Sequence, residues 1–152
     1  MMNDIQVNVR YLHPVLEQTP LTYSTSGSVG LDLRACMDVN MVTLAPGRRM
    51  AIPAGMAIEI LSPGVAGFIF SRSGLGTKEG LVVSQGVGVI DPDYRGEVIV
   101  SLRNTSNTER KINKGQRIAQ LIFMPAFQAQ VFAVGMLSET CRGQGGFGHT
   151  GK

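Results

Sequence analysis

The chain has 152 residues, a formal net charge of +3 and a hydrophobic content of 43%. This length favours a single domain with a substantial core, and the moderate charged content of 16% excludes an intrinsically disordered chain. The small positive charge comes without a basic helix, so we expect no binding to nucleic acid.

The sequence indicates neither secretion nor a membrane span. Its first fourteen residues lack the apolar core of a signal peptide, and nowhere do eighteen apolar residues follow one another. Cys36 and Cys141 lie far apart and lack the cysteine and histidine spacing of a zinc site. We therefore expect a cytoplasmic protein with reduced thiols and no membrane partner.

Short apolar segments separated by Gly, Pro, Asn and Asp turns follow one another along the chain. The predicted strands are residues 5–11, 31–35, 41–44, 49–53, 56–60, 66–71, 81–83, 87–90, 97–104, 110–112, 117–125 and 130–134. The single predicted helix is a short turn over residues 74–78, with the Ser73 hydroxyl as its cap. This pattern predicts an all-β single domain: a sandwich, a jelly roll or a closed barrel.

The last eleven residues contain five glycines, so they cannot bury a core or hold a helix. Among these glycines stand Arg142, Phe147 and Thr150, a set suited to holding phosphates and stacking on a base. We predict that residues 140–152 form a flexible, substrate-closing arm on a catalytic domain of residues 1–139. A plain frayed terminus is the alternative.

Four further segments combine glycine with charged or hydroxyl side chains. They are residues 30–35, which contain Asp32 and Arg34, and residues 71–76, 88–96 and 115–120. Taken singly, each has an ordinary explanation, because alternating charges on a strand are typical of a solvated face and Asp-Pro pairs are typical of turns. The order of the segments, and their combination with the arm, indicate the function more specifically than any one segment does.

In that order the five segments resemble the motifs of the trimeric deoxyuridine triphosphatase (dUTPase) family. The sequence Asp-x-Asp-Tyr-Arg-Gly stands at 91–96, Arg-Ile-Ala-Gln-Leu-Ile at 117–122 and Arg-Gly-x-Gly-Gly-Phe-Gly at 142–148. The resemblance runs from about Leu21 to the C-terminus. It implies a jelly-roll-like β-barrel with one short helix, and a homotrimer with shared active sites. It also implies Mg²⁺-dependent hydrolysis of dUTP to dUMP and pyrophosphate, by water attack on the α-phosphorus.

The resemblance also implies roles for individual residues. Asp91 is expected to orient and deprotonate the attacking water, Gln120 to hold the α-phosphate region or that water, and Ser73 to lie near the bond that breaks. Magnesium is expected to be held mainly by the triphosphate, with Asp32 binding it through a water.

Substrate binding is expected to involve a larger set. Tyr94 would lie under the deoxyribose and exclude a 2′-hydroxyl, while the arm would grip the outer phosphates and stack Phe147 over uracil. The expected substrate-binding residues are Arg72, Ser73, Gly74, Gln85, Gly88, Asp91, Tyr94, Gln120, Arg142, Phe147, Gly148 and Thr150.

Two positions depart from the family pattern. Ser71 stands where the family usually has proline, and Gln85 stands where many bacterial relatives have an asparagine that contacts the base. Two other functions remain as alternatives. A dCTP deaminase of related fold would need a glutamate in the base pocket, and segment 88–96 has Asp91, Asp93 and Tyr94 without one. A non-catalytic nucleotide-binding regulator would need a damaged Asp91, Tyr94 or arm, and all three are intact.

Overall fold

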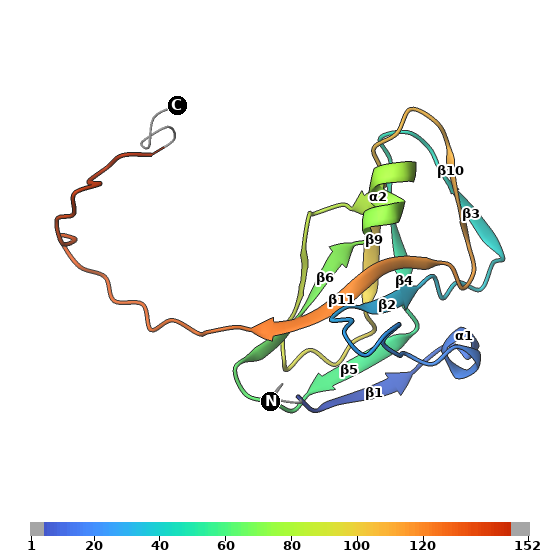
Figure 1. Cartoon of the computed structure of the whole chain (residues 1–152), viewed down its shortest axis with the longest axis horizontal. Coiled ribbons are helices and arrows are strands. Elements are labelled where there is room, and N and C mark those ends of the chain that lie inside the picture. Colours follow the sequence, from blue (N-terminus) through green and yellow to red (C-terminus); the bar gives the residue numbers. More distant parts are fainter. Residues whose placement is uncertain (1–4, 147–152) are drawn as a thin grey trace.

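The structure, a computed structural model, describes residues 5–146 and contains a β-rich body from which the C-terminal segment extends (Figure 1). The elements in chain order are β1 (Val7–Tyr11), α1 (Pro14–Gln18), β2 (Leu31–Arg34), β3 (Met41–Leu44), β4 (Arg49–Pro53), β5 (Met56–Ile60), β6 (Val65–Ser71), α2 (Ser73–Glu79), β7 (Leu81–Val83), β8 (Gly88–Ile90), β9 (Ile99–Asn104), β10 (Arg110–Asn113) and β11 (Arg117–Pro125).

Every pair of neighbouring strands is antiparallel. The largest sheet has the order β2-β11-β6-β8, and a second sheet has the order β4-β9-β7. Two-stranded sheets β1-β5 and β10-β3 complete the body. The strands of residues 5–146 are thus divided among four sheets and do not close into one barrel, although the predicted all-β class is confirmed.

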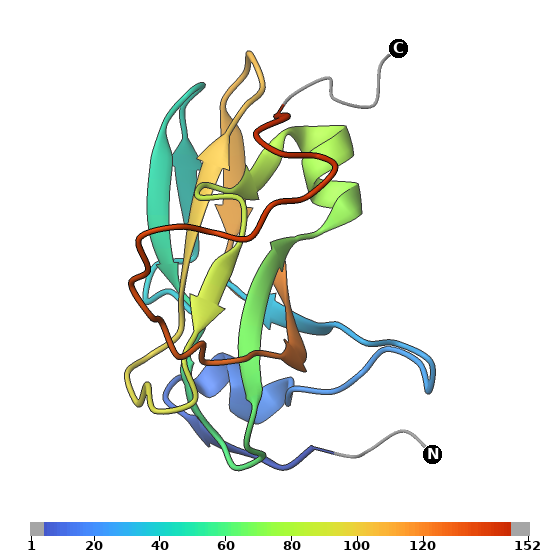
Figure 2. The ribbon, with the colours of Figure 1, turned by 90° about the vertical axis from the view of Figure 1, so that its left-hand side faces the viewer.

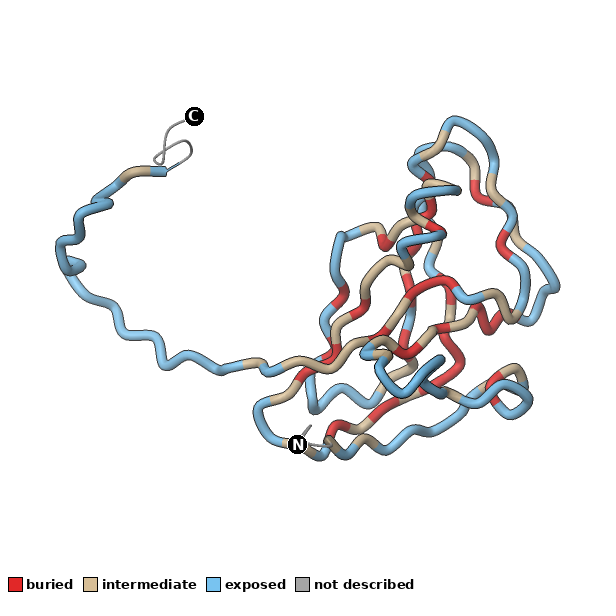
Figure 3. The backbone as a smooth tube through the Cα atoms, viewed as in Figure 1, coloured by how far each residue is buried: buried red, intermediate tan, exposed pale blue. Residues whose placement is uncertain are grey.

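The core lies between these sheets (Figure 3). In β5, buried Met56, Ile58 and Ile60 alternate with half-exposed residues, which is the period of a strand with one buried face. Leu102 of β9 and Leu121 of β11 are completely buried and belong to the same core cluster. Burial of such side chains contributes about 1.5–3 kcal/mol each and fixes which face of each strand points outward.

Helix α2 begins one residue away from the position that the sequence predicted. Ser73 is its first helical residue rather than its cap, because the amide of Gly76 donates to the carbonyl of Arg72 at 2.9 Å. The cap residue Arg72 makes no side-chain capping bond, so the predicted Ser73 cap is wrong. The helix ends at Gly80, whose φ of 68° is a left-handed conformation that favours glycine.

The expectation of one helix is also wrong, because α1 forms a second helix. Its cap is His13, whose Nδ1 accepts a hydrogen bond from the Val15 amide at 3.2 Å. Pro14 follows as the first helical residue, where its fixed φ suits a helix and its missing N–H costs nothing. Buried Leu16 anchors the turn to the core. The His13-Pro14 pair was the sequence signal that could have predicted this helix.

Eleven of the predicted strands are present within two residues at either end. The predicted strand at 130–134 is wrong. Beyond β11, residues 126–146 form an extended, largely exposed segment without a strand partner in the described chain (Figure 3). Alternating apolar residues give a segment strand propensity, but a strand also needs a neighbour for its backbone hydrogen bonds.

Neither helix within residues 5–146 is long and apolar enough to cross a membrane. The two cysteines are free thiols in different environments: Cys36 is buried and Cys141 is exposed. Burial, followed by the nearby Glu97 carboxylate, raises the pKa of Cys36 to about 11.

We predict that iodoacetamide at pH 8 alkylates Cys141 and leaves Cys36 unmodified in the folded protein. The reactive species is the thiolate, and the raised pKa keeps Cys36 protonated as well as inaccessible. Peptide mass spectrometry checks the sites, and the urea-unfolded chain, in which both thiols react, is the control. Rapid modification of native Cys36 would contradict its buried position.

Candidate functional site

One group of predicted site residues lies where β2, β11 and the end of β6 meet. Asp32 of β2 stands directly opposite Gln120 of β11 in the ladder. The Asp32 carboxylate accepts a hydrogen bond from Arg72 Nε at 2.8 Å and another from Arg117 Nη1 at 3.0 Å. Asp32 therefore holds two guanidinium groups at one edge of the sheet. We call Asp32, Arg72, Arg117 and Gln120 the arginine cluster.

Gln120 occupies the middle of this arrangement, because β11 pairs with both β2 and β6. Its Nε2 donates to the carbonyl of Ser71 at 3.2 Å. A Cβ at position 30 would lie 2.7 Å from Gln120 Oε1, so Gly30 gives the amide the space that it occupies. Ser73 and Gly74 follow Arg72 at the exposed start of α2.

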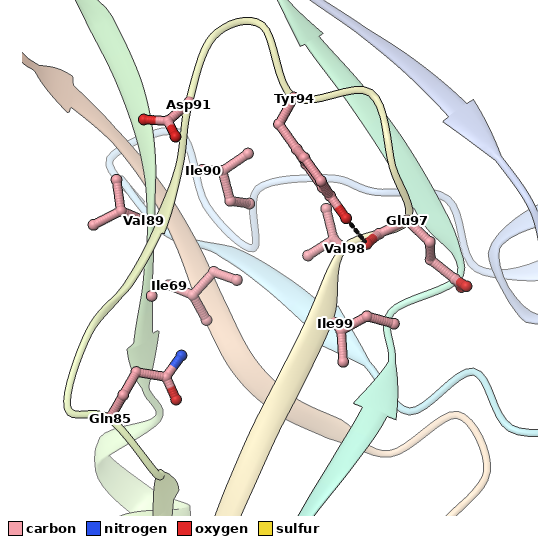
Figure 4. A pocket seen from close by; sticks show the side chains of 10 residues that line it. Ile69, Gln85, Val89, Ile90, Asp91, Tyr94, Glu97, Val98 and Ile99 are labelled. Carbon is pink, nitrogen blue, oxygen red and sulfur yellow. Dashed lines mark hydrogen bonds between the residues drawn. The ribbon is translucent and has the colours of Figure 1, made fainter.

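A second group lines a hollow of about 240 Å³ between β8 and β9 (Figure 4). Gln85, Gly88, Asp91 and Tyr94 contribute to its wall, and the remaining lining is mostly apolar. The Tyr94 hydroxyl donates to the Glu97 carbonyl at 3.0 Å. A Cβ at Gly96 would overlap that hydroxyl, so glycine is required for the ring to lie there. We call this space the hairpin hollow.

The turn that carries Asp91 and Tyr94 is tied to the body by Arg95. Its guanidinium donates to the Pro92 carbonyl at 2.7 Å and to Glu59 Oε1 of β5 at 3.1 Å. The hydrogen bond from Asn8, followed by the charge of Arg95, lowers the pKa of Glu59. Glu59 is therefore ionised at neutral pH and remains a partner for Arg95.

Asp91, at one end of the hairpin hollow, lies far from the arginine cluster in one chain. The β6–β8 register pairs Gly67 with Ile90, which places Asp91 level with Ala66, six residues before Arg72. At about 3.3 Å per strand residue, Asp91 and Arg72 are separated by roughly 20 Å along β6. Figures 1 and 2 show the same separation, with α2 at one end of the body and the 91–97 turn at the other.

The described part of the arm, residues 140–146, lies at neither group. Arg142 is exposed, and its Nε donates to the carbonyl of Gly145 within the arm itself. Phe147, Gly148 and Thr150 lie outside the described residues. The predicted site residues thus fall into two groups and a separate arm.

Three residues that the sequence-based site set omitted support these groups: Arg117, Arg95 and Gly96. Arg117 reads as an ordinary surface cation in the sequence, and only the pairing of β11 with β2 brings it to Asp32. Arg95 and Gly96 belong to the sequence motif at 91–96. Their position directly after Tyr94 was the signal that could have identified them.

No group of three or more His, Cys, Asp or Glu residues is placed to hold a metal ion within residues 5–146. Both Asp32 oxygens already accept hydrogen bonds from arginines. These residues do not fit a cage that binds a metal directly. They do fit an ion that arrives already bound to phosphates, because the phosphate oxygens then supply the ligands that these residues do not.

Comparison with known proteins places this geometry in context. A protein-family model described as dUTPase matches residues 17–151. The chain is 48% identical over 149 residues to the deoxyuridine 5′-triphosphate nucleotidohydrolases of Enterobacter sp. (strain 638) and Citrobacter koseri, covering 97% of each chain. The structure resembles that of Staphylococcus bacteriophage 80alpha dUTPase with dUPNHPP, with a TM-score of 0.84, 24% identity and coverage of 97% and 99%.

The fold is thus the β jelly roll of the solved dUTPase structures, as the resemblance to the family implied. The matched family model and the relatives at 48% identity identify the family as well as the fold. The chain belongs to the dUTPase family.

We predict that Asp32→Asn lowers the free energy of unfolding by about 1–2 kcal/mol, because it leaves two guanidinium groups without their shared anion. Asp38→Asn is the matched control, since Asp38 is exposed and forms no ion pair within residues 5–146. Urea unfolding at one fixed protein concentration measures both variants. Equal stabilities of the two variants would show that the arginine cluster contributes nothing to the fold.

Proposed function

We propose that this protein hydrolyses dUTP to dUMP and pyrophosphate by attack of water on the α-phosphorus. Membership of the dUTPase family supports the overall activity. The observation that carries the assignment of the site is the presence of both an arginine cluster and a hollow whose wall combines apolar side chains with Gln85, Asp91 and Tyr94. Such a pair suits a substrate with a charged phosphate end and a flat base end.

The arginine cluster binds the phosphates in this proposal. Arg72 offers guanidinium donors to phosphate oxygens, with the Ser73 hydroxyl and the Gly74 amide beside it. Asp32 positions Arg72 by accepting a hydrogen bond from its Nε. Gln120 lies at the same edge and holds the α-phosphate or the attacking water. Donors fixed in advance stabilise the charge that moves onto pyrophosphate as it leaves.

Asp91 acts as the general base. It accepts a proton from water as the water oxygen bonds to the α-phosphorus, and the bond from that phosphorus to the bridging oxygen breaks. Pyrophosphate departs with the electron pair of the broken bond. A positioned carboxylate in this role contributes about 10²–10⁴ in rate.

The hairpin hollow binds uracil and deoxyribose. Gly88 is buried beneath the hollow, where a Cβ would lie 3.2 Å from that of Ile69, so its backbone comes close to a bound base. The Tyr94 ring lies under the sugar and leaves no room for a 2′-hydroxyl. Gln85 stands at the other end of the hollow (Figure 4).

The proposed cofactor is Mg²⁺, which supplies charge neutralisation to the triphosphate when bound. Its ligands come mainly from the nucleotide in this proposal. Asp32 faces the hydrated ion through a water, because both its oxygens are already shared with arginines.

The proposed assembly is a homotrimer with shared active sites in the cytoplasm. A separation of roughly 20 Å prevents Asp91 and Arg72 of one chain from acting on one phosphate, so a second chain must bring its hairpin. The segment after β11 exposes large apolar residues, among them Phe127 at 93%, Val131 at 90% and Met136 at 88%. Apolar side chains on an extended segment favour docking on another subunit.

In this trimer, residues 140–152 form the arm that closes a site of another chain over the body of residues 1–139. Arg142 and Thr150 grip the outer phosphates, while Phe147 and Gly148 cover uracil. Closure excludes water from the phosphates after binding.

One assay separates this function from its alternatives. The protein is incubated with dUTP and with dCTP in the presence of Mg²⁺, and both pyrophosphate and ammonia are measured. Pyrophosphate from dUTP without ammonia from dCTP supports the proposal. Ammonia from dCTP indicates a deaminase, and neither product indicates a nucleotide-binding regulator.

We predict that Asp91→Asn lowers kcat at least a hundredfold while dUTP binds with nearly the same affinity. Asparagine keeps the shape of the side chain and loses its basicity, so the effect falls on turnover rather than on binding. Asp93→Asn, in the same exposed turn, is the matched control and retains activity. If Asp91→Asn turned over dUTP within threefold of the parent, Asp91 would not be the base.

We also predict that activity reappears when two inactive variants, Asp91→Asn and a deletion of residues 142–152, are refolded together. A working site then takes Asp91 from a deletion chain and the arm from an Asp91→Asn chain. In a closed ring of three, every mixed trimer contains that order at one of its three sites, and neither variant alone contains it.

Affinity tags on the two variants show that mixed trimers have formed, and the pyrophosphate assay measures the recovered activity. Mixed trimers as inactive as their parents would mean that hairpin and arm act from the same chain.

A further inference from the structure

A second hollow in the body is lined by positive charge. It has a volume of about 420 Å³ and lies where the start of β4, the end of β9 and the residue after β7 meet. Its lining consists of Gly47, Arg48, Arg49, Ser84 and Arg103. Among the described residues, no carboxylate and no apolar side chain belongs to this lining. We call this space the basic hollow. None of its residues takes part in the proposed catalytic site.

Strand pairing places two of the arginines side by side. Arg49 of β4 stands directly opposite Arg103 of β9 in the ladder. Both are exposed on the outer face of the sheet, because the alternate residues Ile52 and Leu102 are buried in the core. The Cβ atoms of residues directly opposite each other in an antiparallel pair lie about 4.5–5.5 Å apart, and like charges at these positions destabilise the sheet.

Backbone hydrogen bonds hold the third arginine beside this pair. The amide of Asn104 donates to the carbonyl of Arg48 at 3.0 Å, and the amide of Gly47 donates to the carbonyl of Asn104 at 2.8 Å. On the other side, Ser84 is fixed to Ser101 by its amide at 2.8 Å and by its hydroxyl, which donates to the Ser101 hydroxyl at 2.7 Å. The fold therefore gathers the three arginines around one space.

The guanidinium groups of the basic hollow lack the partners that most other arginines have. Within residues 5–146, Arg48, Arg49 and Arg103 form no ion pair and donate no side-chain hydrogen bond, a state shared only by Arg10 among the arginines of that range. The other arginines donate to a carboxylate, a backbone carbonyl or a serine: Arg34, Arg72, Arg95, Arg110, Arg117 and Arg142. The basic hollow thus concentrates as much positive charge as the net +3 of the whole chain.

We propose that the basic hollow binds a small multivalent phosphate anion, of the class of inorganic phosphate or pyrophosphate. A guanidinium presents a planar fork of N–H donors that matches two phosphate oxygens. A bound anion also offsets the repulsion between Arg49 and Arg103. The lining described offers no ring or apolar side chain to hold a base, so the ligand is a free anion rather than the phosphate tail of a nucleotide.

This anion site is separate from the arginine cluster of the proposed catalytic site. Asp32 and Gln120 of that cluster belong to the sheet β2-β11-β6-β8, whereas Arg49 and Arg103 belong to the sheet β4-β9-β7. Binding of an anion here is independent of dUTP hydrolysis, so the absence of turnover would refute the proposed function and leave this inference intact.

The test measures how much pyrophosphate raises the melting temperature, in EDTA and at fixed ionic strength and protein concentration. A ligand that binds the folded state raises the melting temperature with its concentration. The double variant Arg49→Gln/Arg103→Gln is expected to lose part of this shift, through about a tenfold weaker affinity for pyrophosphate at the basic hollow. Arg72→Gln removes the contribution of the arginine cluster. The two losses add in the triple variant, because distant sites act independently.

Three controls separate specific binding from other effects. Arg10→Gln/Lys111→Gln removes the same charge from exposed positions without ion pairs in residues 5–146 and keeps the full shift. Sodium chloride at equal ionic strength gives a smaller shift, and an equal one would show that the salt only screens the arginines. ADP stabilises the parent through the basic hollow less than pyrophosphate does, and a larger effect of ADP there would identify a nucleotide site instead.

The protein without added anion distinguishes a ligand site from a structural one. The double variant Arg49→Gln/Arg103→Gln is expected to melt about 1–3 °C higher than the parent at low salt, because it relieves the repulsion between the two guanidinium groups. Gel filtration is expected to show an unchanged oligomeric state. A lower melting temperature or a changed oligomeric state would mean that the arginines support the fold or contact a second copy. Either result, or an undiminished pyrophosphate shift in the double variant, would overturn the inference.

Discussion

The length of strand β6 is the constraint on which the arrangement of the site depends. The arginine cluster forms where β6 ends at Ser71, and the hairpin hollow forms beside the middle of the strand, where Gly67 to Ile69 pair with β8. A seven-residue strand is rigid and holds these groups apart. A single chain therefore presents the arginine cluster and Asp91 in different places, which supports the proposed assembly of the site from more than one copy.

In the arginine cluster, the geometry depends on the Asp32 carboxylate. Asp32 is partly buried beside Arg72 and Arg117, and it neutralises part of their charge while fixing their direction. Guanidinium groups lose much side-chain freedom when they bind an anion, and restraint before binding reduces that cost. Asp32 thus fixes the direction of two guanidinium donors at this edge of the sheet.

Around the hairpin hollow, the geometry depends on small residues and hydrogen bonds. Gly88 and Gly96 allow the backbone and the Tyr94 ring to approach closely, while Arg95 anchors the turn to Glu59. The hollow thus combines apolar side chains with a few polar groups, as is usual for small-ligand sites.

The sequence alone determined the all-β class, most strand positions and the identity of the motif residues. Those features are local: alternation marks a strand, Gly and Pro mark its ends, and the motif strings are contiguous. Local signals failed where a second segment decided the outcome. Residues 130–134 have strand propensity but no neighbour in the described chain, and the Ser73 hydroxyl was not needed once the Arg72 carbonyl accepted the first helical bond.

Only the tertiary structure decided which motifs meet. The pairing of β11 with both β2 and β6 brings Asp32, Arg72, Arg117 and Gln120 together, although they are spread over almost ninety residues. The same sheet keeps Asp91 away from them, and the β7–β9 pairing places Ser101 against Ser84. Strand register is set by long-range burial of one face of each strand, and no short stretch of sequence contains that information.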